Sequence, residues 1–406
     1  MKKILGLSVI VSSVVMAGAY KVPEQSVNST ALGAAYVAHT TGADTAYFNP
    51  ANMAFMADKQ FMEAGVTLAH LPRSKFSGAN TRFSGQSEVE NLYLPNLHYV
   101  AKPIGDFRWG ASLTVPGGLT KRWETPVQKA SAEEFTLKVL ELNPVASYKV
   151  TDNFALAGGV RLIHAEGVVK SDASAVSASK ATRDMEGDTQ EFGYNLAMTY
   201  KPMSDVNMAV TYRSKVDLDL EGEADISAVF SPLKSYDATV SVPLPAALNV
   251  SLSKTWQDRY TVELNYEKTY WSAYSELDFN YGSAIHPFLV PAFDDPKAKN
   301  WKDTDTFRIG LTAEVSDKLT LMAGYAKDES PIPKKYVSYE LPDSDANIYT
   351  FGLRIQANEN LSYGVAYLRD EKDSFTLASG ENEPGITGKF SGGGADLFTM
   401  GVAYNF

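Results

Sequence analysis

The stretch FTMGVAYNF, residues 398–406, gives the first indication of the fold. On an extended chain its large apolar residues share one face: Phe398, Met400, Val402, Tyr404 and Phe406. The residues between them are small or polar. Large apolar side chains on one face and small or polar ones on the other are typical of a strand between lipid and a lumen. The stretch therefore predicts a transmembrane β-strand.

The same two-residue period recurs through most of the chain. It is found near residues 107–113, 154–162, 194–200, 208–212, 248–252, 260–266, 307–313, 319–325, 349–355 and 361–367. A soluble β-sandwich is the alternative, but it would not explain outward faces so rich in Tyr. The chain holds 22 Tyr and 19 Phe, and such aromatic residues form the girdles of outer-membrane barrels.

The links between these stretches alternate in length. Short links fall at 102–106, 151–152, 202–205, 257–258, 316–318 and 358–359. Long polar stretches fall between them, near 70–91, 116–134, 168–190, 214–245, 271–304, 329–347 and 370–395. This pattern predicts tight turns at one rim and long loops at the other, around about 14 antiparallel strands. The barrel must be closed, because lipid cannot satisfy the hydrogen bonds of an open sheet edge. We assign it to residues 61–406.

The N-terminus has the pattern of a secretory signal peptide. Lys2 and Lys3 precede an apolar run that ends in Ala17-Gly18-Ala19, small residues spaced for signal peptidase. The run is too short for the roughly 20 apolar residues of a spanning helix. We assign residues 1–19 to the signal peptide and expect the mature chain to begin near Tyr20.

Composition excludes several classes of protein. The net charge of -11 argues against nucleic-acid binding, which needs clustered Lys and Arg. With 0 Cys there is no disulfide framework and no thiol chemistry. The 5 His are each isolated, so no Ser–His pair and no metal-ligand spacing is found. We therefore expect no enzyme, no metal and no cofactor.

Residues 20–60 lack the strand period and are rich in small residues. Residues 30–39 could form a short helix, and Asn49-Pro50 forces a turn. A barrel of this strand number has a wide lumen, which must be filled if it is to be selective. We predict that this segment is a plug in the lumen. The alternative is a disordered periplasmic tail, which the apolar content of the segment disfavours.

The N-terminal segment contains four short motifs, Glu24-Gln25-Ser26, Leu32-Gly33-Ala34-Ala35, Ala43-Asp44-Thr45 and above all Asn49-Pro50-Ala51. In these motifs it resembles the hatch of the FadL/TodX family of outer-membrane transporters. Weaker matches continue through Leu94-Pro95-Asn96, Tyr212-Arg213-Ser214 and Ser330-Pro331-Ile332-Pro333 to the end of the chain. The resemblance implies a 14-stranded barrel with an N-terminal hatch in the Gram-negative outer membrane.

The resemblance also implies passive uptake of hydrophobic compounds, with long-chain fatty acids as the first expectation. Aromatic or aliphatic hydrocarbons are the alternative cargo, and a general porin, an adhesin or a barrel enzyme are the alternative classes. We expect a monomer whose partners are its cargo, outer-membrane lipids and lipopolysaccharide. A weak divalent-cation contact to lipopolysaccharide is an alternative reading of the acidic stretch 217–225, which otherwise predicts a solvated loop face.

By the same resemblance, cargo leaves sideways through an inward kink of the third strand. Tyr20 and Lys21 are then expected near the ligand pocket. Pro116-Gly117-Gly118 is the candidate lateral opening, because Pro removes a ladder donor and Gly weakens a strand. The alternative is that Pro116 merely starts a loop.

Several arginines fall on the inward face by register. They are Arg108, Arg161, Arg213, Arg308 and Arg354. Inward arginines usually pair with inward carboxylates, for which Glu141, Glu263 and Glu314 are the candidates. The functional alternative is that Arg161, Arg213, Arg308 or Arg354 meets a fatty-acid carboxylate, which guanidinium binds through two parallel hydrogen bonds.

Overall fold

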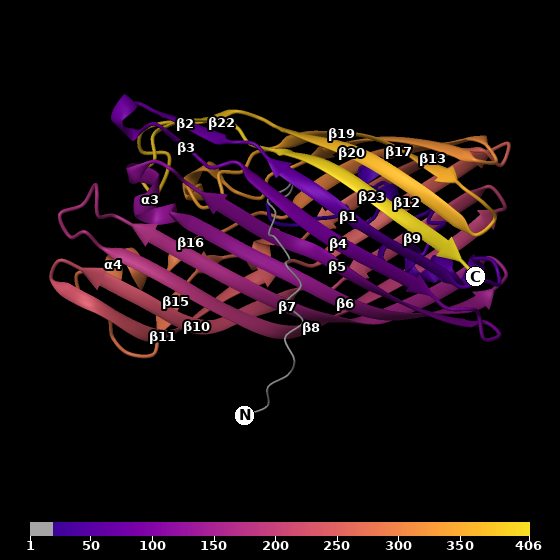
Figure 1. Cartoon of the computed structure of the whole chain (residues 1–406), viewed down its shortest axis with the longest axis horizontal. Coiled ribbons are helices and arrows are strands. Elements are labelled where there is room, and N and C mark those ends of the chain that lie inside the picture. The colour runs from indigo at the N-terminus through magenta and orange to yellow at the C-terminus, as the bar shows by residue number, and fades with distance from the viewer. Residues whose placement is uncertain (1–18) are drawn as a thin grey trace.

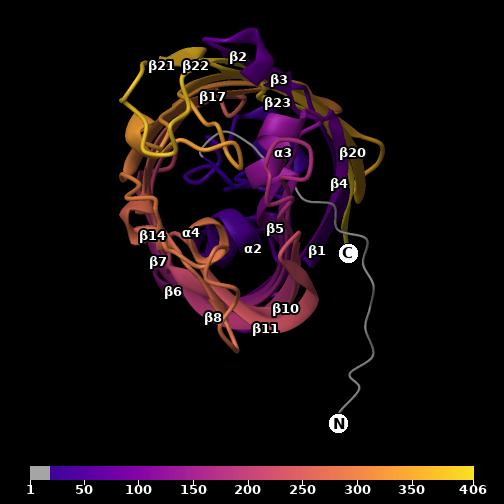
Figure 2. The same cartoon turned by 90° about the vertical axis from the view of Figure 1, so that its left-hand side faces the viewer.

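The computed structural model describes residues 19–406 and shows a closed antiparallel β-barrel (Figures 1 and 2). Nearly all of the predicted signal peptide, residues 1–19, lies outside the described residues. The wall has 14 strands, in which β10 continues β9 and β11 leads into β12. Their bounds are β1 Phe61–Leu71, β4 Glu90–Val100, β5 Phe107–Arg122, β6 Glu134–Thr151, β7 Phe154–Asp172, β8 Thr182–Met203, β9 Val206–Arg213, β10 Val216–Ala228, β11 Ser231–Leu244, β12 Ala247–Trp256, β13 Tyr260–Thr269, β17 Thr304–Ser316, β18 Leu319–Asp328, β19 Ala346–Gln356, β20 Leu361–Lys372 and β23 Ala395–Asn405.

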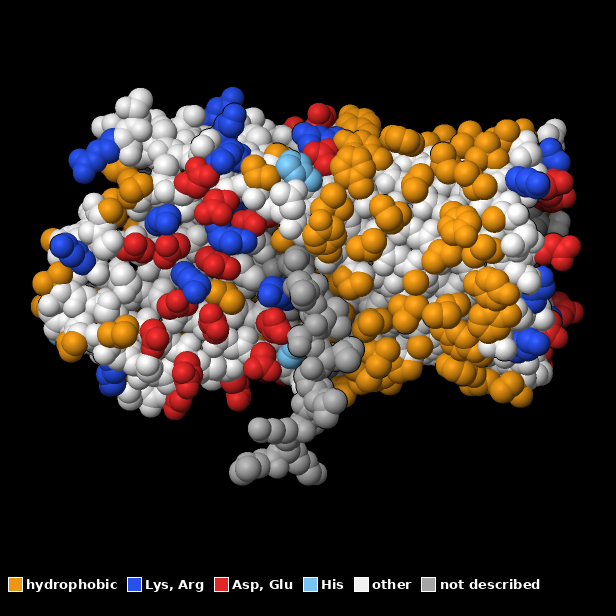
Figure 3. Space-filling view, in the orientation of Figure 1, with side chains coloured by type: hydrophobic (Ala, Val, Ile, Leu, Met, Phe, Trp, Pro, Cys, Tyr) orange, Lys and Arg blue, Asp and Glu red, His pale blue; other side chains and the backbone are white. Residues whose placement is uncertain are grey.

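The barrel closes between its first and last strands. β1 pairs with β4 on one side and with β23 on the other, from Phe61↔Asn405 to His70↔Asp396. The outward residues form an apolar belt around one half of the barrel (Figure 3). On β8, for example, Leu196 is 54% exposed while the alternate residue Ala197 is buried. The predicted fold class is confirmed, and so is the outward face predicted for the last strand.

The other half of the barrel stands beyond the belt and is charged (Figure 3). Here the predicted long loops were too long, because several wall strands continue past the lipid-facing part. β10 and β11 occupy most of 214–245, and β7 and β8 leave only residues 173–181 between them. The reason is that these extensions still alternate. Val216, Leu218 and Leu220 point inward into a core, and their burial stabilises the continued pairing of the strands.

Shorter elements cap this outer end. They are β2 Ser74–Gly78, η2 Thr81–Phe83, β3 Gly85–Gln86, α3 Pro126–Ala132, η3 Trp271–Ala273, β14 Glu276–Leu277, β15 Phe279–Tyr281, α4 Val290–Phe293, β16 Lys297–Ala298, η4 Lys334–Tyr336, β21 Phe375–Leu377 and β22 Gly388–Gly392. None of the helices among residues 19–406 has the length and apolar character of a membrane-spanning helix.

The segment before β1 lies inside the ring of strands, where Figure 2 shows α2. It contains α1 Val27–Ala31, α2 Thr45–Phe48 and η1 Pro50–Phe55. The helix expected over residues 30–39 was misplaced. Ser26 and Ser29 form a capping box that starts the helix earlier, and the positive φ of Gly33 and Ala34 ends it.

Glycines on the inner wall make room for this segment. A Cβ built on Gly324 would lie 2.4 Å from the backbone of Leu32, and one on Gly352 would lie 2.6 Å from Ala31. Such distances are too short for any larger residue. α1 is therefore seated directly against the backbone of the wall.

Candidate functional site

An apolar pocket lies inside the outer half of the barrel. It has a volume of about 830 Å³, counting its open mouth, and draws its walls from β5, β6, β7, β8, β10, β11 and the outer loops. Its lining includes Leu119, Phe135, Leu137, Val169, Met185, Leu220, Val242, Leu277, Phe279, Trp301 and Ile332. A concave site of this size with few polar groups suits a hydrophobic small molecule.

Tyr20 lines the pocket. Its ring packs edge-on against Trp271, with 4.7 Å between ring centroids, and also contacts Trp301. Lys21 faces away from the apolar pocket and lines two smaller neighbouring cavities. There it pairs with Glu267 at 2.5 Å. The structure thus brings Tyr20 to the pocket and places Lys21 directly beside it.

One buried cation lines the pocket that the sequence analysis did not single out. Lys299, in the outer loop between β13 and β17, is 5% exposed and contacts the carboxylate of Glu340. Burial, and secondarily the charge of Lys297, lowers the pKa of Lys299 to about 7. No local pattern distinguished this lysine from others in the loops, since only the fold of the loop turns it inward.

The wall is interrupted between β4 and β5. Their ladder runs from Val100↔Gly110 to Leu97↔Leu113 and then stops. Beyond the gap the residues just before β4 meet the end of β5, where the N–H of Glu88 donates to the carbonyl of Arg122 at 2.8 Å. Between these points, residues 90–96 of β4 and 114–121 of β5 share no register. β5 is also bulged here, because its pairing with β6 shifts between Thr114 and Gly117.

The N-terminal segment takes the place of β4 at this interruption. Val22 N–H donates to the carbonyl of Pro116 at 3.0 Å, and Gly118 N–H donates to the carbonyl of Tyr20 at 2.8 Å. The alternative in which Pro116 starts a loop is wrong, because β5 continues to Arg122. Pro116, Gly117 and Gly118 therefore lie at the interruption, next to Tyr20, which lines the pocket.

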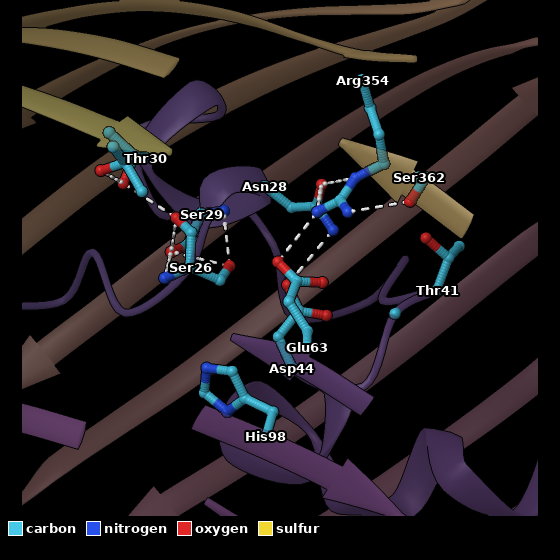
Figure 4. Close-up of polar contacts among 12 residues, drawn as sticks. Ser26, Asn28, Ser29, Thr30, Thr41, Asp44, Glu63, His98, Arg354 and Ser362 are labelled. Carbon is cyan, nitrogen blue, oxygen red and sulfur yellow. Dashed lines mark hydrogen bonds and ion pairs between the residues drawn. The ribbon is translucent and has the colours of Figure 1, made fainter. Parts of the chain in front are cut away.

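The inward arginines are paired with carboxylates or amides. Arg161 and Arg213 both contact Glu141, the former at 2.9 Å. Arg308 pairs with Glu267 at 3.0 Å. Arg354 donates to Asn28 at 3.0 Å and to Glu63 at 2.9 Å, and Figure 4 shows how the three side chains lie.

One of the carboxylates expected to pair with these arginines, Glu263, does not do so. Glu263 accepts instead from the N–H groups of Val37, Ala38 and His39 at 2.6–2.8 Å. Arg161, Arg213 and Arg308 thus join strands of the wall to one another. Arg354 joins the wall to the N-terminal segment through Asn28. Their meeting with a substrate carboxylate stays a prediction.

Asn49-Pro50-Ala51 fixes the N-terminal segment to the wall. The Asn49 side chain accepts from Ala51 N–H and donates to Val37 and to Thr199 of β8, both at 2.8 Å. Nearby, Arg108 donates to the carbonyls of Ala101, Met53, Met56, Ala57 and Lys59. His98, also in this interior, is bonded to Ser112 and to Gln25, which makes it structural.

Comparison with known proteins agrees with this architecture. The family model described as outer membrane protein transport protein (OMPP1/FadL/TodX) matches residues 8–406. The chain belongs to the OMPP1/FadL/TodX family. As a member it lies in the Gram-negative outer membrane and carries hydrophobic compounds, and members of this family are transporters rather than enzymes.

Curated relatives match over most of their length. Outer membrane protein P1 of Haemophilus influenzae is 25% identical, over 88% of this chain and 87% of that protein. The long-chain fatty acid transport protein of Escherichia coli K12 is 25% identical, over 85% and 86%.

Solved structures show the same fold. A FadL homologue of Pseudomonas aeruginosa has a TM-score of 0.82 at 19% identity, covering 95% of this chain and 99% of that one. The toluene transporter TodX of Pseudomonas putida has a TM-score of 0.72 at 18% identity, covering 94% and 97%.

Proposed function

We propose that this FadL/TodX-family barrel takes up long-chain fatty acids by holding them in the apolar pocket and releasing them sideways into the membrane. The observation that carries the proposal is the junction of Tyr20, Gly118 and the β4–β5 interruption. Tyr20 lines the pocket and is hydrogen-bonded to Gly118, which lies at the break in the wall. Pocket and opening are therefore separated by one residue.

The cargo is inferred from the polar groups of the pocket. Lys299, which is paired with Glu340, offers a cation inside a mostly apolar site, which suits a ligand with one carboxylate and a long hydrocarbon tail. Two curated relatives point the same way, since the matched Escherichia coli proteins are named long-chain fatty acid transport proteins. Hydrocarbons are the second candidate, favoured by how few polar groups line the pocket.

Lateral release has an energetic reason. Each CH₂ group of a fatty acid gains about 0.8 kcal/mol when it leaves water, so release of a long chain into the periplasm is strongly uphill. Release into the bilayer avoids this cost but requires a break in the hydrogen-bonded wall. The gap between β4 and β5 at Pro116-Gly117-Gly118 supplies one.

The segment of residues 20–60 is proposed to be the hatch. Its helices lie inside the ring, and Asn49 and Arg108 bind it to the inner wall. With the hatch in place the lumen is not an open pore, so cargo must use the pocket and the side opening.

Binding and release can be tested separately. Purified protein is incubated with a radiolabelled long-chain fatty acid and, in parallel, with an alkane of equal chain length, and both are measured at equilibrium. We expect saturable binding of both, with the acid bound more tightly. Uptake of the acid by cells lacking their own transporter tests release. Binding without uptake would contradict the lateral path, and no saturable binding would contradict the pocket.

A further inference from the structure

The wall is interrupted a second time, between β8 and the strand formed by β9 and β10. β8 pairs with β9 as far as Asn195↔Arg213, and with β10 only from Asp188↔Glu221 onward. Between these points residues 189–193 and 215–220 share no register. Ser214 closes one end of the slit, since its N–H donates to the carbonyl of Tyr194 at 2.9 Å. The slit lies at the outer edge of the apolar belt, where Phe192 is 70% exposed.

Side chains of β10 cover this slit from the inside. A Cβ built on Gly193 of β8 would lie 2.7 Å from Val216. One built on Gly167 of β7 would lie 3.0 Å from Leu220, although β8 stands between β7 and β10. Leu220 therefore reaches across the inner face of β8. In the slit the wall is closed by side-chain packing and not by a ladder of hydrogen bonds.

Directly beyond the slit the inner face of the wall carries no side chains, because three neighbouring strands each have a glycine there. Gly167, Gly187 and Gly222 lie side by side on the inner face of β7, β8 and β10. A Cβ on Gly222 would lie 1.9 Å from the carbonyl of Glu186, so only glycine fits. The apolar pocket reaches this row from inside, and an outer cleft reaches it from outside. Both cavities are lined by Gly167, Glu186, Gly187, Gly222 and Glu223.

The outer cleft is acidic. Its exposed carboxylates belong to Glu166, Asp184, Glu186, Asp188, Glu221, Glu223 and Asp225. Several face each other directly across the ladder, such as Asp188↔Glu221 and Glu186↔Glu223. Figure 3 shows acidic side chains gathered on this outer half of the barrel. Two lysines offset part of this charge, since Lys170 pairs with Asp184 at 2.8 Å and lies 3.9 Å from Glu186, and Lys138 pairs with Glu166 at 3.6 Å. The carboxylates of the cleft still outnumber the lysines that pair with them.

We propose that this slit and glycine row form a side port into the apolar pocket for uncharged apolar molecules, with Leu220 as the side chain that closes it. A molecule at the outer edge of the membrane would pass between β8 and β10 when Leu220 moves aside. The acidic mouth repels carboxylates and concentrates cations, so fatty-acid anions are excluded from this route. The port rests on the proposed function in that the pocket is the cargo site, and it gives uncharged hydrocarbons an entry route that fatty-acid anions do not share.

Thiol accessibility tests the port without any transport assay. The chain has 0 Cys, so Ala238→Cys, in the pocket beside Gly222, gives a single reporter. Intact cells are treated with a cationic or an anionic methanethiosulfonate, and the labelling rate is measured. The reporter is combined with Leu220→Ala or with the matched control Leu277→Ala. Leu277 is buried and lines the same pocket, but lies on β14 away from the slit.

We expect Leu220→Ala to raise cationic labelling by about tenfold, with little change in anionic labelling. Leu277→Ala enlarges the pocket equally and should change neither rate. Adding Glu186→Gln and Glu223→Gln should reduce the preference for the cation, because it removes two of the carboxylates of the mouth. Equal acceleration of labelling by Leu220→Ala and Leu277→Ala, or a cation preference that the two Glu→Gln changes leave undiminished, would overturn the port. Leu220→Val serves the same comparison if Leu220→Ala lowers the yield of folded barrel. The labelling assay tests only the port, whereas equilibrium binding of fatty acid to the unchanged protein tests only the pocket. Either proposal can therefore be contradicted without the other.

Discussion

The side chain of Gln25 replaces a missing strand partner for Val115. Its amide nitrogen donates to the carbonyl of Val115 at 2.8 Å, and its amide oxygen accepts from the N–H of Val115 at 2.9 Å. These are the two bonds that a neighbouring strand would make. The same amide also donates to Val22, which holds the N-terminal segment in register with β5. A single side chain thus satisfies both backbone hydrogen-bonding groups of Val115 in β5, where β4 no longer pairs with that strand.

Removing the side-chain hydrogen bonds of Gln25 to Val115 should destabilise the barrel. Gln25→Met keeps the volume but leaves a buried N–H and carbonyl unpaired, at a cost of about 1–3 kcal/mol for each. We expect a lower midpoint of thermal unfolding, followed by circular dichroism. Gln190→Met, at an exposed site, is the matched control and should have almost no effect. Equal midpoints for the two variants would show that water or another group satisfies Val115.

Restoring a backbone donor at the opening should hinder release. Pro116→Thr returns an N–H to the bulge and raises β-propensity, so the gap should narrow. We expect slower uptake of labelled fatty acid by cells, with unchanged equilibrium binding to purified protein. Changes at Gly117 are less informative, since a Cβ there would lie 3.1 Å from the carbonyl of Tyr20 and displace it. Unchanged uptake by the folded Pro116→Thr variant would place the exit elsewhere.

The hatch should control conductance. Deletion of residues 20–58 should turn a poorly conducting protein into an open pore in planar bilayers. A milder change is Gly324→Ala, whose Cβ would lie 2.4 Å from the backbone of Leu32 and push α1 off the wall. Gly158→Ala is the control, because its Cβ makes only ordinary contacts of 3.4 Å or more. Conductance that stays low after the deletion would mean that the segment is not a plug.

Lys299 should distinguish acids from hydrocarbons. Lys299→Met removes the cation of the pocket, and a charged hydrogen bond contributes about 1.5–3 kcal/mol. We expect fatty-acid affinity to fall by at least about tenfold, while the affinity for an alkane of equal length is unchanged. Equal losses for both ligands would show that Lys299 acts only on the shape of the pocket.

Acid binding should also weaken with rising pH. The pKa of Lys299 is lowered to about 7 by burial, so its charged form is held below that pH and is lost above it. A bound carboxylate needs the charged form. We therefore expect tighter binding at pH 6 than at pH 8 in isothermal calorimetry, with alkane binding as the control. Glu340→Gln, which removes the competing carboxylate, should strengthen acid binding, and a flat profile would rule out Lys299 as the partner.

The sequence by itself determined the barrel. Alternation of the kind seen in residues 398–406 is a local property, because neighbouring side chains on a strand must face opposite environments. It fixed which residues meet lipid, and alternating link lengths fixed the strand count. The same reasoning underestimated the length of the strands in the outer half of the barrel. Polar residues such as Asp217 and Asp219 led to the prediction of a loop where the structure has β10.

Only the tertiary structure decided where the wall opens and what lies behind it. Gln25 and Val115 are 90 residues apart, and neither carries a pattern that predicts their pairing. Lys299 reaches the pocket only through the path of its loop. The inward arginines could be placed by register, but register did not choose their partners. Arg161 pairs with Glu141 on the neighbouring strand, whereas Arg354 pairs with Glu63, 291 residues away. Side-chain period is set by each strand alone, whereas pockets and openings arise from contacts among distant strands, and these no short stretch of sequence encodes.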